Sequence, residues 1–406
     1  MLNPYFLMSL LYLAVAVLAA LDASLTGFGL LPWMNGLRWL RVHFITLGLL
    51  TEAVFGIAPI LVAARLGRPP PPTRWDIWML LNAGIAVLLV GIPLVNQPLI
   101  FTGGTLIFLA ATLLAVHLWQ MKASSGQAER PTSLSRQFYV TGLLYLLVGI
   151  IVGTGLWLGW SGPLRIKTPL EVHIHANNWG FMSLVFAGLL VDLMPRLSGR
   201  PLASARSIHL IFWMTTLGAL GLVAGPWMGG VLAVLVPGLV LHLVATLWLV
   251  VLMVKGLWRS EHAGTPGAWH MVTAYAWILA PVLMAPLVIL KMPGIPGGRI
   301  EGTAPQALIY GWVLQFGLAL VPYLAMRLFQ PDQRPRLGGS WLSLAAANLG
   351  SLLIWASIFI ESMQGPLQGL AYGLYGLAIL LVLHQLGQIV RGGWSRVEEA
   401  APEPAL

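Results

Sequence analysis

Two histidines separated by one residue are the first feature of this sequence that could do chemistry. His173 and His175 lie in the segment EVHIHANNWG, at the head of a long apolar run. A neutral imidazole is a good ligand for iron near pH 7, and a histidine within an apolar span indicates a site by default. Residues two apart on a helix point about 200° apart. The two imidazoles are therefore expected to face different pockets and cannot hold one iron from the same side.

A third histidine occupies a matching place in an internal repeat. Residues 43–69 and 175–201 align without a gap: glycine stands at +5 and +13 from His43 and from His175, and Gly-Arg-Pro follows at +24 to +26. A fainter copy begins at Gln306, and the copies are about 130 residues apart. Glycines at these intervals leave room on a helix face for a flat macrocycle or for a close neighbouring helix.

The elements that carry these residues are predicted to cross a membrane. The chain has 406 residues, 58% hydrophobic and only 9% charged, and its apolar runs approach the roughly 20 residues that span a bilayer as a helix. Twelve spans are predicted, at 5–29, 41–64, 75–95, 97–119, 137–160, 172–195, 207–226, 230–254, 269–290, 305–326, 340–360 and 366–390.

Three repeats of four spans predict the fold class and the domain organisation. We expect an all-α integral membrane protein with about 12 transmembrane helices in three pseudo-symmetric four-helix arcs. The pseudo-repeats begin near His43, His175 and Gln306. A single polytopic membrane domain is expected over residues 1–392, followed by a cytoplasmic tail over residues 393–406.

Composition and charge exclude several classes of site and partner. The chain has no cysteine, which rules out disulfides, iron-sulfur clusters and thiolate metal sites. The net charge of +9 comes from basic residues in the connections between spans, where the positive-inside rule explains them, so no nucleic-acid binding is predicted. Sixteen of the 22 Lys and Arg residues fall on one side. Both termini are therefore expected to be cytoplasmic, and the leading histidines lie near the outer face.

A few further polar residues are candidates for functional roles. Glu52 lies near mid-membrane, where a carboxyl group suggests proton transfer, cation binding or a neutral hydrogen-bonded acid. Asp192, near an inner helix end, is expected to pair with Arg196 at i+4. His242, near mid-membrane, is a weaker metal-ligand candidate than His43, His173 and His175. His117 and His262, at helix ends or in loops, are expected to be solvated.

Basic residues flank the outer ends of the spans that carry the leading histidines. Arg38 and Arg41 precede His43, and Arg165 precedes the His pair. If haem is bound nearby, their guanidinium groups could pair with its propionates. Loop charges at a membrane interface are also common without such a role.

Residues 173–230 resemble the late helices of subunit I of the haem-copper oxidases, especially the cbb-type oxidases and related nitric oxide reductases. In that family a His-x-His on one helix serves two haems. The resemblance implies that His173 is the axial ligand of a high-spin haem and His175 that of a low-spin haem. The absence of cysteine favours b-type haem, because covalent attachment would need Cys-x-x-Cys-His. The chain lacks the adjacent His-His pair of the family's copper site, so the usual copper centre is not expected.

The place of His43 stays open in this comparison. The His-x-His lies on span six, whereas in the oxidases it lies on span ten. If the arcs are cyclically shifted, His43 faces the haem held by His173. Without a shift, His43 pairs with His175 on one haem.

Three hypotheses follow. The first is a b-type haem protein with one or two haems in a prokaryotic plasma membrane, active in electron transfer or in handling nitric oxide or oxygen. The His-led repeats also resemble the NnrS-type proteins, haem-binding membrane proteins linked to nitric oxide tolerance. The second is a catalytic oxidase or nitric oxide reductase subunit whose second metal uses Glu52, His209 or His242. The third is a cofactor-free transporter or structural subunit. Electrons, where needed, would come from quinol or a separate cytochrome, and other respiratory membrane subunits are candidate partners.

Overall fold

The computed structural model describes residues 3–32, 35–122 and 134–399, with the backbone alone described at 35–38 and 394–399. Within these residues every regular element is helical. Eleven of the helices are long and apolar enough to cross a membrane, and Trp75–Gly91 is a shorter apolar helix. These twelve segments match the twelve predicted spans in order, so the all-helical, multi-span part of the prediction is confirmed. The arrangement in three arcs stays a prediction.

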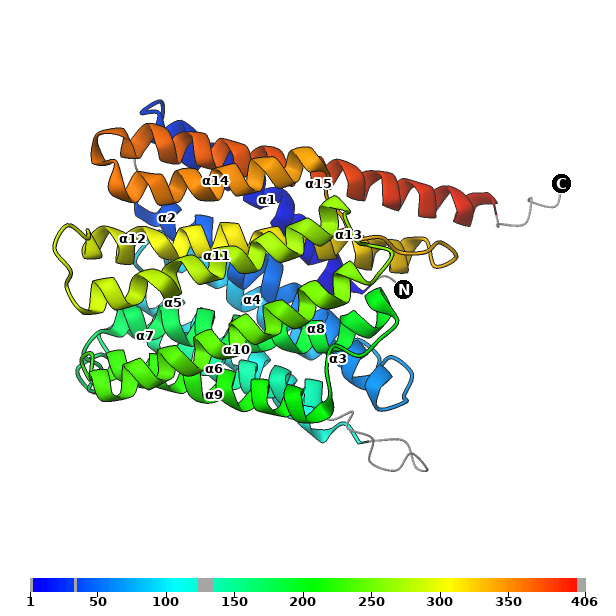
Figure 1. The fold of residues 1–406 in the computed structure, drawn as a ribbon, viewed down its shortest axis with the longest axis horizontal. Helices are drawn as coiled ribbons and strands as arrows, with labels where there is room; N and C mark the ends of the chain where they lie inside the picture. Colours follow the sequence, from blue (N-terminus) through cyan, green and yellow to red (C-terminus); the bar gives the residue numbers. More distant parts are fainter. Residues whose placement is uncertain (1–2, 33–34, 123–133, 400–406) are drawn as a thin grey trace. The chain divides into compact units, whose positions relative to one another are not determined.

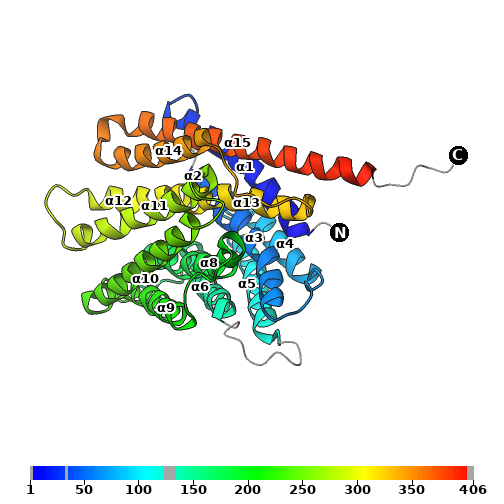
Figure 2. The ribbon, with the colours of Figure 1, turned by 45° about the vertical axis from the view of Figure 1, so that its right-hand side comes forward.

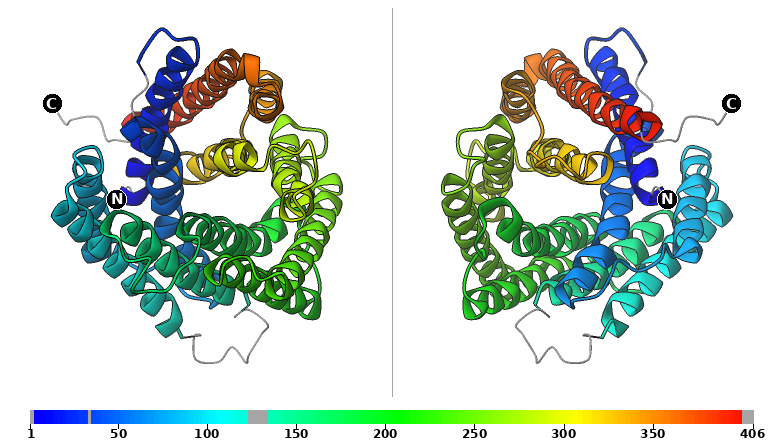
Figure 3. Two further views of the ribbon diagram at one scale, coloured as in Figure 1. Left: turned by 90° about the vertical axis from the view of Figure 1, so that its left-hand side faces the viewer. Right: turned by 90° about the vertical axis from the view of Figure 1, so that its right-hand side faces the viewer.

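The chain forms two compact units, one of residues 1–9 and 51–260 and one of residues 10–50 and 261–406. α1 (Pro4–Gly27) begins in the first unit and ends in the second. The first unit also contains α3 (Thr51–Arg65), α4 (Trp75–Gly91), α5 (Gln97–Gln120), α6 (Leu134–Leu158), α7 (Pro169–His175), η3 (Ala176–Met182), α8 (Ser183–Ser198), α9 (Ala205–Trp227) and α10 (Leu232–Trp258). Within it, α4 packs along α5 and α9 along α10 (Figures 1 and 3).

The second unit holds the remaining helices. They are α2 (Asn35–His43), η1 (Phe44–Leu50), α11 (Pro266–Ile289), α12 (Gly297–Leu308), η4 (Ile309–Leu314), α13 (Gln315–Phe329), α14 (Trp341–Phe359), η5 (Glu361–Met363) and α15 (Gln364–Glu399). α14 and α15 lie side by side (Figure 2), α13 packs against α11 and α15, and η1 contacts η4.

Three spans are much more deeply buried than the others, and each is the span that begins a copy of the sequence repeat. Within an 18-residue apolar window of each span, the share of residues that are buried is 72% for Trp39–Arg65, 83% for Pro169–Ser198 and 83% for Gly297–Phe329. In no other span does this share exceed 50%. A helix that is apolar on all sides can be surrounded by protein rather than lipid. Pro169–Ser198 therefore lies in the interior of the first unit and Gly297–Phe329 in that of the second, whereas Trp39–Arg65 contributes buried residues to both units.

Each of the three buried spans contains a short π-helical segment, which begins directly after His43 and His175 and three residues after Gln306. These segments are η1, η3 and η4, and each one includes the +5 glycine of its copy, Gly48, Gly180 or Gly311. π-helical insertions in α-helices are rare and frequently mark functional sites. The repeat read from the sequence thus coincides with a shared local backbone feature.

The Gly-Arg-Pro motif of the first two copies has a structural role. Gly67 and Gly199 adopt positive φ angles of 68° and 67° just after the ends of α3 and α8. A left-handed residue after the last turn closes a helix, and glycine does so without strain from a Cβ atom. The motif therefore ends the two interior spans and needs no chemical function.

Candidate functional site

The His pair lies at the C-terminal end of α7, and each imidazole is fixed by a different neighbouring helix. Nδ1 of His173 lies 2.8 Å from the backbone oxygen of Gly149 on α6. Nδ1 of His175 lies 2.6 Å from the backbone oxygen of Leu222 on α9. The expectation that the two side chains face different surroundings is consistent with these separate partners.

These hydrogen bonds determine the chemistry of both rings. A carbonyl oxygen can only accept, so in each case Nδ1 carries the proton and donates it. The lone pair then resides on Nε2, which is the tautomer of a histidine that ligates metal through Nε2. The donor chemistry of both residues therefore fits axial ligands of haem iron.

The imidazole of His173, which is held by the Gly149 carbonyl, packs closely against α6. A Cβ atom at Gly153 on α6 would lie 2.6 Å from Cε1 of His173, so only glycine fits beside this imidazole. Asn177, one turn further along, donates to the backbone oxygen of His173 at 2.8 Å, and its amide nitrogen lies 3.4 Å from Nδ1. Asn177 is a supporting residue that the sequence reading did not identify.

His242 and His175 lie on either side of Trp179, and the three rings form an aromatic cluster and not a set of metal ligands. The Trp179 ring lies 6.4 Å from the ring of His175 and 5.2 Å from that of His242. His242 is fully buried, with Nε2 3.3 Å from the backbone oxygen of Trp179 and Nδ1 3.3 Å from the Thr246 hydroxyl. Both ring nitrogens are thus engaged with protein groups, an arrangement typical of a satisfied core histidine.

His43 ends α2 in the second unit and shares the Nδ1 contact seen in the His pair. Its Nδ1 lies 2.7 Å from the backbone oxygen of Trp39, one turn earlier in the same helix. The indole of Trp39 stacks on the imidazole at 4.1 Å with an interplanar angle of 12°. This stacking holds the ring in one orientation, and again the carbonyl selects the tautomer with the lone pair on Nε2.

The three arginines considered for propionates differ in their surroundings. Arg41 is buried and donates to Asp22 at 2.7 Å, with a further bond to the Thr26 hydroxyl at 3.3 Å. The Arg41 guanidinium therefore already has a carboxylate partner. Arg165 is exposed in the loop before α7, in a left-handed conformation with φ of 53°. Arg38 lies in α2, and its side chain is outside the described residues.

Two expectations about polar residues are wrong. Asp192 pairs with Arg65 on α3 at 2.7 Å rather than with Arg196, and it also accepts a bond from the Tyr139 hydroxyl at 2.9 Å. The tertiary partner wins because α8 is an interior helix whose acidic side chain points toward α6 and α3. His262, in the loop between α10 and α11, is buried, not solvated, and this burial lowers its pKa.

The remaining histidines do not assemble a second metal centre. His209 is exposed and accepts a bond from Trp213, and His270 is buried beside the Ser343 hydroxyl at 2.9 Å. Among the residues that the structure describes, no group of three His, Cys, Asp or Glu side chains could hold a metal ion. The residues proposed for an alternative second metal, Glu52, His209 and His242, lie on three different helices, α3, α9 and α10.

The repeat glycines serve helix packing. A Cβ atom at Gly48 would lie 2.6 Å from the Tyr12 ring of α1, and one at Gly180 would collide with the Tyr145 ring of α6. At Gly311 it would lie 3.0 Å from the Trp277 ring of α11. These glycines were expected to make room for either a macrocycle or a close helix. At these three positions an aromatic side chain of a neighbouring helix occupies the room.

Comparison with models of known protein families and with curated protein sequences finds no match for this chain.

Proposed function

We propose that the protein is a b-type haem-binding membrane protein similar to haem-copper oxidase subunit I, in which His173 and His175 are axial ligands on opposite sides of α7. The observation that carries this proposal is the pair of Nδ1 contacts to backbone carbonyls on α6 and α9. They fix tautomer and ring orientation in both residues, as is usual for histidines that bind metals. His43, with the same contact to a backbone carbonyl, is the proposed third ligand.

A bound haem would supply one-electron chemistry and, at a five-coordinate iron, a binding position for nitric oxide or oxygen. The chain itself would orient the imidazoles and keep bulk water away. The interior position of Pro169–Ser198 supports this role, because 83% of that span is buried within the protein. We assign the protein to electron transfer or diatomic gas handling in a prokaryotic plasma membrane. Both termini would be cytoplasmic, and electrons would come from quinol or a separate cytochrome.

The test is a reduced-minus-oxidised visible spectrum of the detergent-purified protein, with haem quantified as the pyridine complex. A b-type spectrum with one or two haems per chain is expected, and carbon monoxide or nitric oxide should shift the bands of any iron with an open position. A colourless protein from haem-replete cells would contradict the proposal and favour a transporter or structural subunit. Copper or non-haem iron in stoichiometric amount would instead favour a catalytic oxidase or reductase.

A further inference from the structure

Among the carboxyl groups that the structure describes in the first unit, Glu52 is the most deeply buried one without an ion pair. It is the midpoint of the span Trp39–Arg65, and its side chain is fully buried. Neither carboxyl oxygen receives a hydrogen bond of normal geometry. Asp192 differs, since Arg65 neutralises it. An unpaired carboxylate at this depth would be a costly buried charge, so the neutral acid is the stable form.

The polar surroundings of Glu52 come from α4 and α1. Asn82 on α4 is close enough to act on the carboxyl group, and its own Oδ1 is buried without a hydrogen bond. Asn82 Nδ2 donates to the backbone oxygen of Trp78 at 3.0 Å. The Tyr5 ring of α1 packs against Phe55, which follows Glu52 by three residues on α3. A carboxyl group beside an amide and a phenol can hold and exchange a proton, whereas a bound cation needs more oxygen ligands than these.

A pocket approaches this group along the same face of α3. Phe55, Gly56 and Pro59 follow Glu52 at helical spacing, and all three line the pocket. Pro59 has no N–H, so the Phe55 carbonyl lacks its intrahelical donor and can accept from a water molecule. Tyr5 packs against Phe55, with 6.4 Å between ring centroids.

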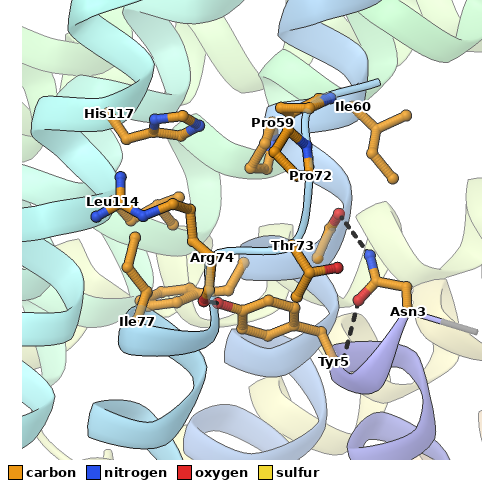
Figure 4. Close-up of a pocket in the computed structure, with 13 residues that line it drawn as sticks. Asn3, Tyr5, Pro59, Ile60, Pro72, Thr73, Arg74, Ile77, Leu114 and His117 are labelled. Carbon is orange, nitrogen blue, oxygen red and sulfur yellow. Dashed lines mark hydrogen bonds between the residues drawn. The ribbon is translucent and has the colours of Figure 1, made fainter. Parts of the chain in front are cut away.

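Polar groups continue from Tyr5 to the protein surface. Figure 4 shows Tyr5, Arg74 and His117, which come from three elements, around the pocket. The Tyr5 hydroxyl donates to the backbone oxygen of Arg74 at 3.1 Å, and Nε2 of His117 is buried without a hydrogen bond. Arg74 pairs with exposed Asp76 at 2.5 Å. The pocket therefore joins a charged surface to the buried phenol.

We propose that Glu52 is a proton-loading site, a neutral carboxylic acid at mid-membrane that exchanges its proton with one face through the pocket of Tyr5, Arg74 and His117. The proton leaves a carboxyl oxygen of Glu52 for a water molecule in the pocket and returns by the reverse step, so no other reactant is needed. The basic residues of the 65–74 connection make this face the cytoplasmic one. The site does not depend on haem and would be present in a colourless protein.

Infrared spectroscopy of the purified protein at pH 7 tests this site directly. The wild type should show the C=O stretch of a protonated carboxyl group, and the band should shift to lower frequency in D2O. Glu52→Gln should lose the band, and Glu52→Asp should move it. Glu361→Gln, at an exposed carboxylate paired with Arg299, is the matched control and should leave it unchanged.

The route is tested by the rate of the D2O shift. His117→Phe fills the pocket without touching Glu52, so the band should stay while its exchange becomes at least several-fold slower. A wild-type spectrum without the band, or a band that never exchanges, would overturn the proposal. Exchange at the wild-type rate in His117→Phe would overturn the route. Loss of the band on adding sodium chloride, with no change on adding choline chloride, would identify a cation site instead.

Discussion

Two four-span segments have the same construction but different polar content: residues 134–258, which contain the repeat copy led by His175 (the middle repeat), and residues 266–393, which contain the copy led by Gln306 (the C-terminal repeat). Each begins with a helix whose aromatic residue, Tyr145 or Trp277, abuts the +5 glycine of the next span. Each then has a deeply buried span with a π-helical segment, followed by a closely packed pair of helices. At the leading position, however, the middle repeat has His175 and the C-terminal repeat has Gln306.

The two repeats share their packing features and differ in the side chains that could bind a cofactor. The glycine, the π-helical segment and the facing aromatic ring occur in both repeats, so they belong to helix packing and not to a cofactor. Gln306 accepts a hydrogen bond from the Tyr372 hydroxyl, which satisfies it within its own repeat. At the position two residues earlier, the middle repeat has His173 and the C-terminal repeat has Ala304. The imidazoles of the middle repeat are therefore the groups that distinguish the two repeats at these positions, and they are the proposed ligands.

The largest expected effect comes from removing those imidazoles. We expect His173→Ala and His175→Ala each to lose one haem signal, because alanine has no nitrogen donor to replace Nε2. Loss of a supporting bond alone costs about 10- to 100-fold in metal affinity, and loss of the ligand should cost more. Haem per chain, measured as the pyridine complex, and the visible difference spectrum are the readouts.

Gln306→Ala is the matched control, since it changes the equivalent position of the C-terminal repeat. It should leave haem content and the spectrum as in the wild type. If Gln306→Ala and His175→Ala bleach the protein equally, the distinction between scaffold and ligand fails. Full haem content in both histidine variants would contradict ligation by the pair.

A second prediction concerns the buried carboxylate of the middle repeat, at a position where the C-terminal repeat has Tyr323. Arg65→Ala should destabilise the protein by about 3 kcal/mol, the lower part of the range for breaking a buried pair, because Arg65 is partly exposed. The variant leaves the Asp192 carboxyl group, whose side chain is 1% exposed in the wild type, without its ionic partner, so it must either carry an uncompensated charge or take up a proton. Thermal unfolding in detergent would measure the loss.

Arg65→Ala combined with Asp192→Asn should recover part of that stability, since it removes the uncompensated charge. Tyr139→Phe, which removes only the 2.9 Å bond to Asp192, should cost about 1.5–3 kcal/mol. A double variant less stable than Arg65→Ala would show that the pair is not coupled.

Much of this fold could be read from the sequence, because hydropathy and helix length determine where a chain can cross a bilayer. The twelve spans and the glycine pattern of the repeats required no other information. The partners of buried polar residues could not be read in the same way. For Asp192 the i+4 spacing within the helix favoured Arg196. The partner is instead Arg65, which is 127 residues away in sequence and reaches Asp192 from the end of α3. The carbonyls that fix His173 and His175 are backbone groups and leave no signal in side-chain identity.

The repeat glycines give a third prediction. Gly180→Ala should cost about 1–3 kcal/mol, as expected for overpacking. Its Cβ would collide with the Tyr145 ring, whose hydroxyl is held at 2.8 Å by the Thr216 carbonyl. Gly311→Ala should lose a similar amount of stability, because its Cβ atom would press on the Trp277 ring. Gly298→Ala, with no atom within 4 Å of its Cβ position, should be unchanged in the same thermal assay, and a loss there equal to that of Gly180→Ala would contradict the packing role.

The smallest expected effect tests whether the hydrogen bond between Tyr372 and Gln306 in the C-terminal repeat has any part in haem binding. Tyr372→Phe removes the hydroxyl that donates to Gln306 but keeps the ring that faces the Arg41 guanidinium, 6.0 Å from the centroid. Gln306 is partly exposed, so water can replace the lost donor, and the cost should be about 0.5–1.5 kcal/mol. The haem spectrum should stay as in the wild type. A spectral change in Tyr372→Phe, without one in Tyr145→Phe, would mean that the C-terminal repeat contributes to the site, and the assignment of chemistry to the middle repeat would be wrong.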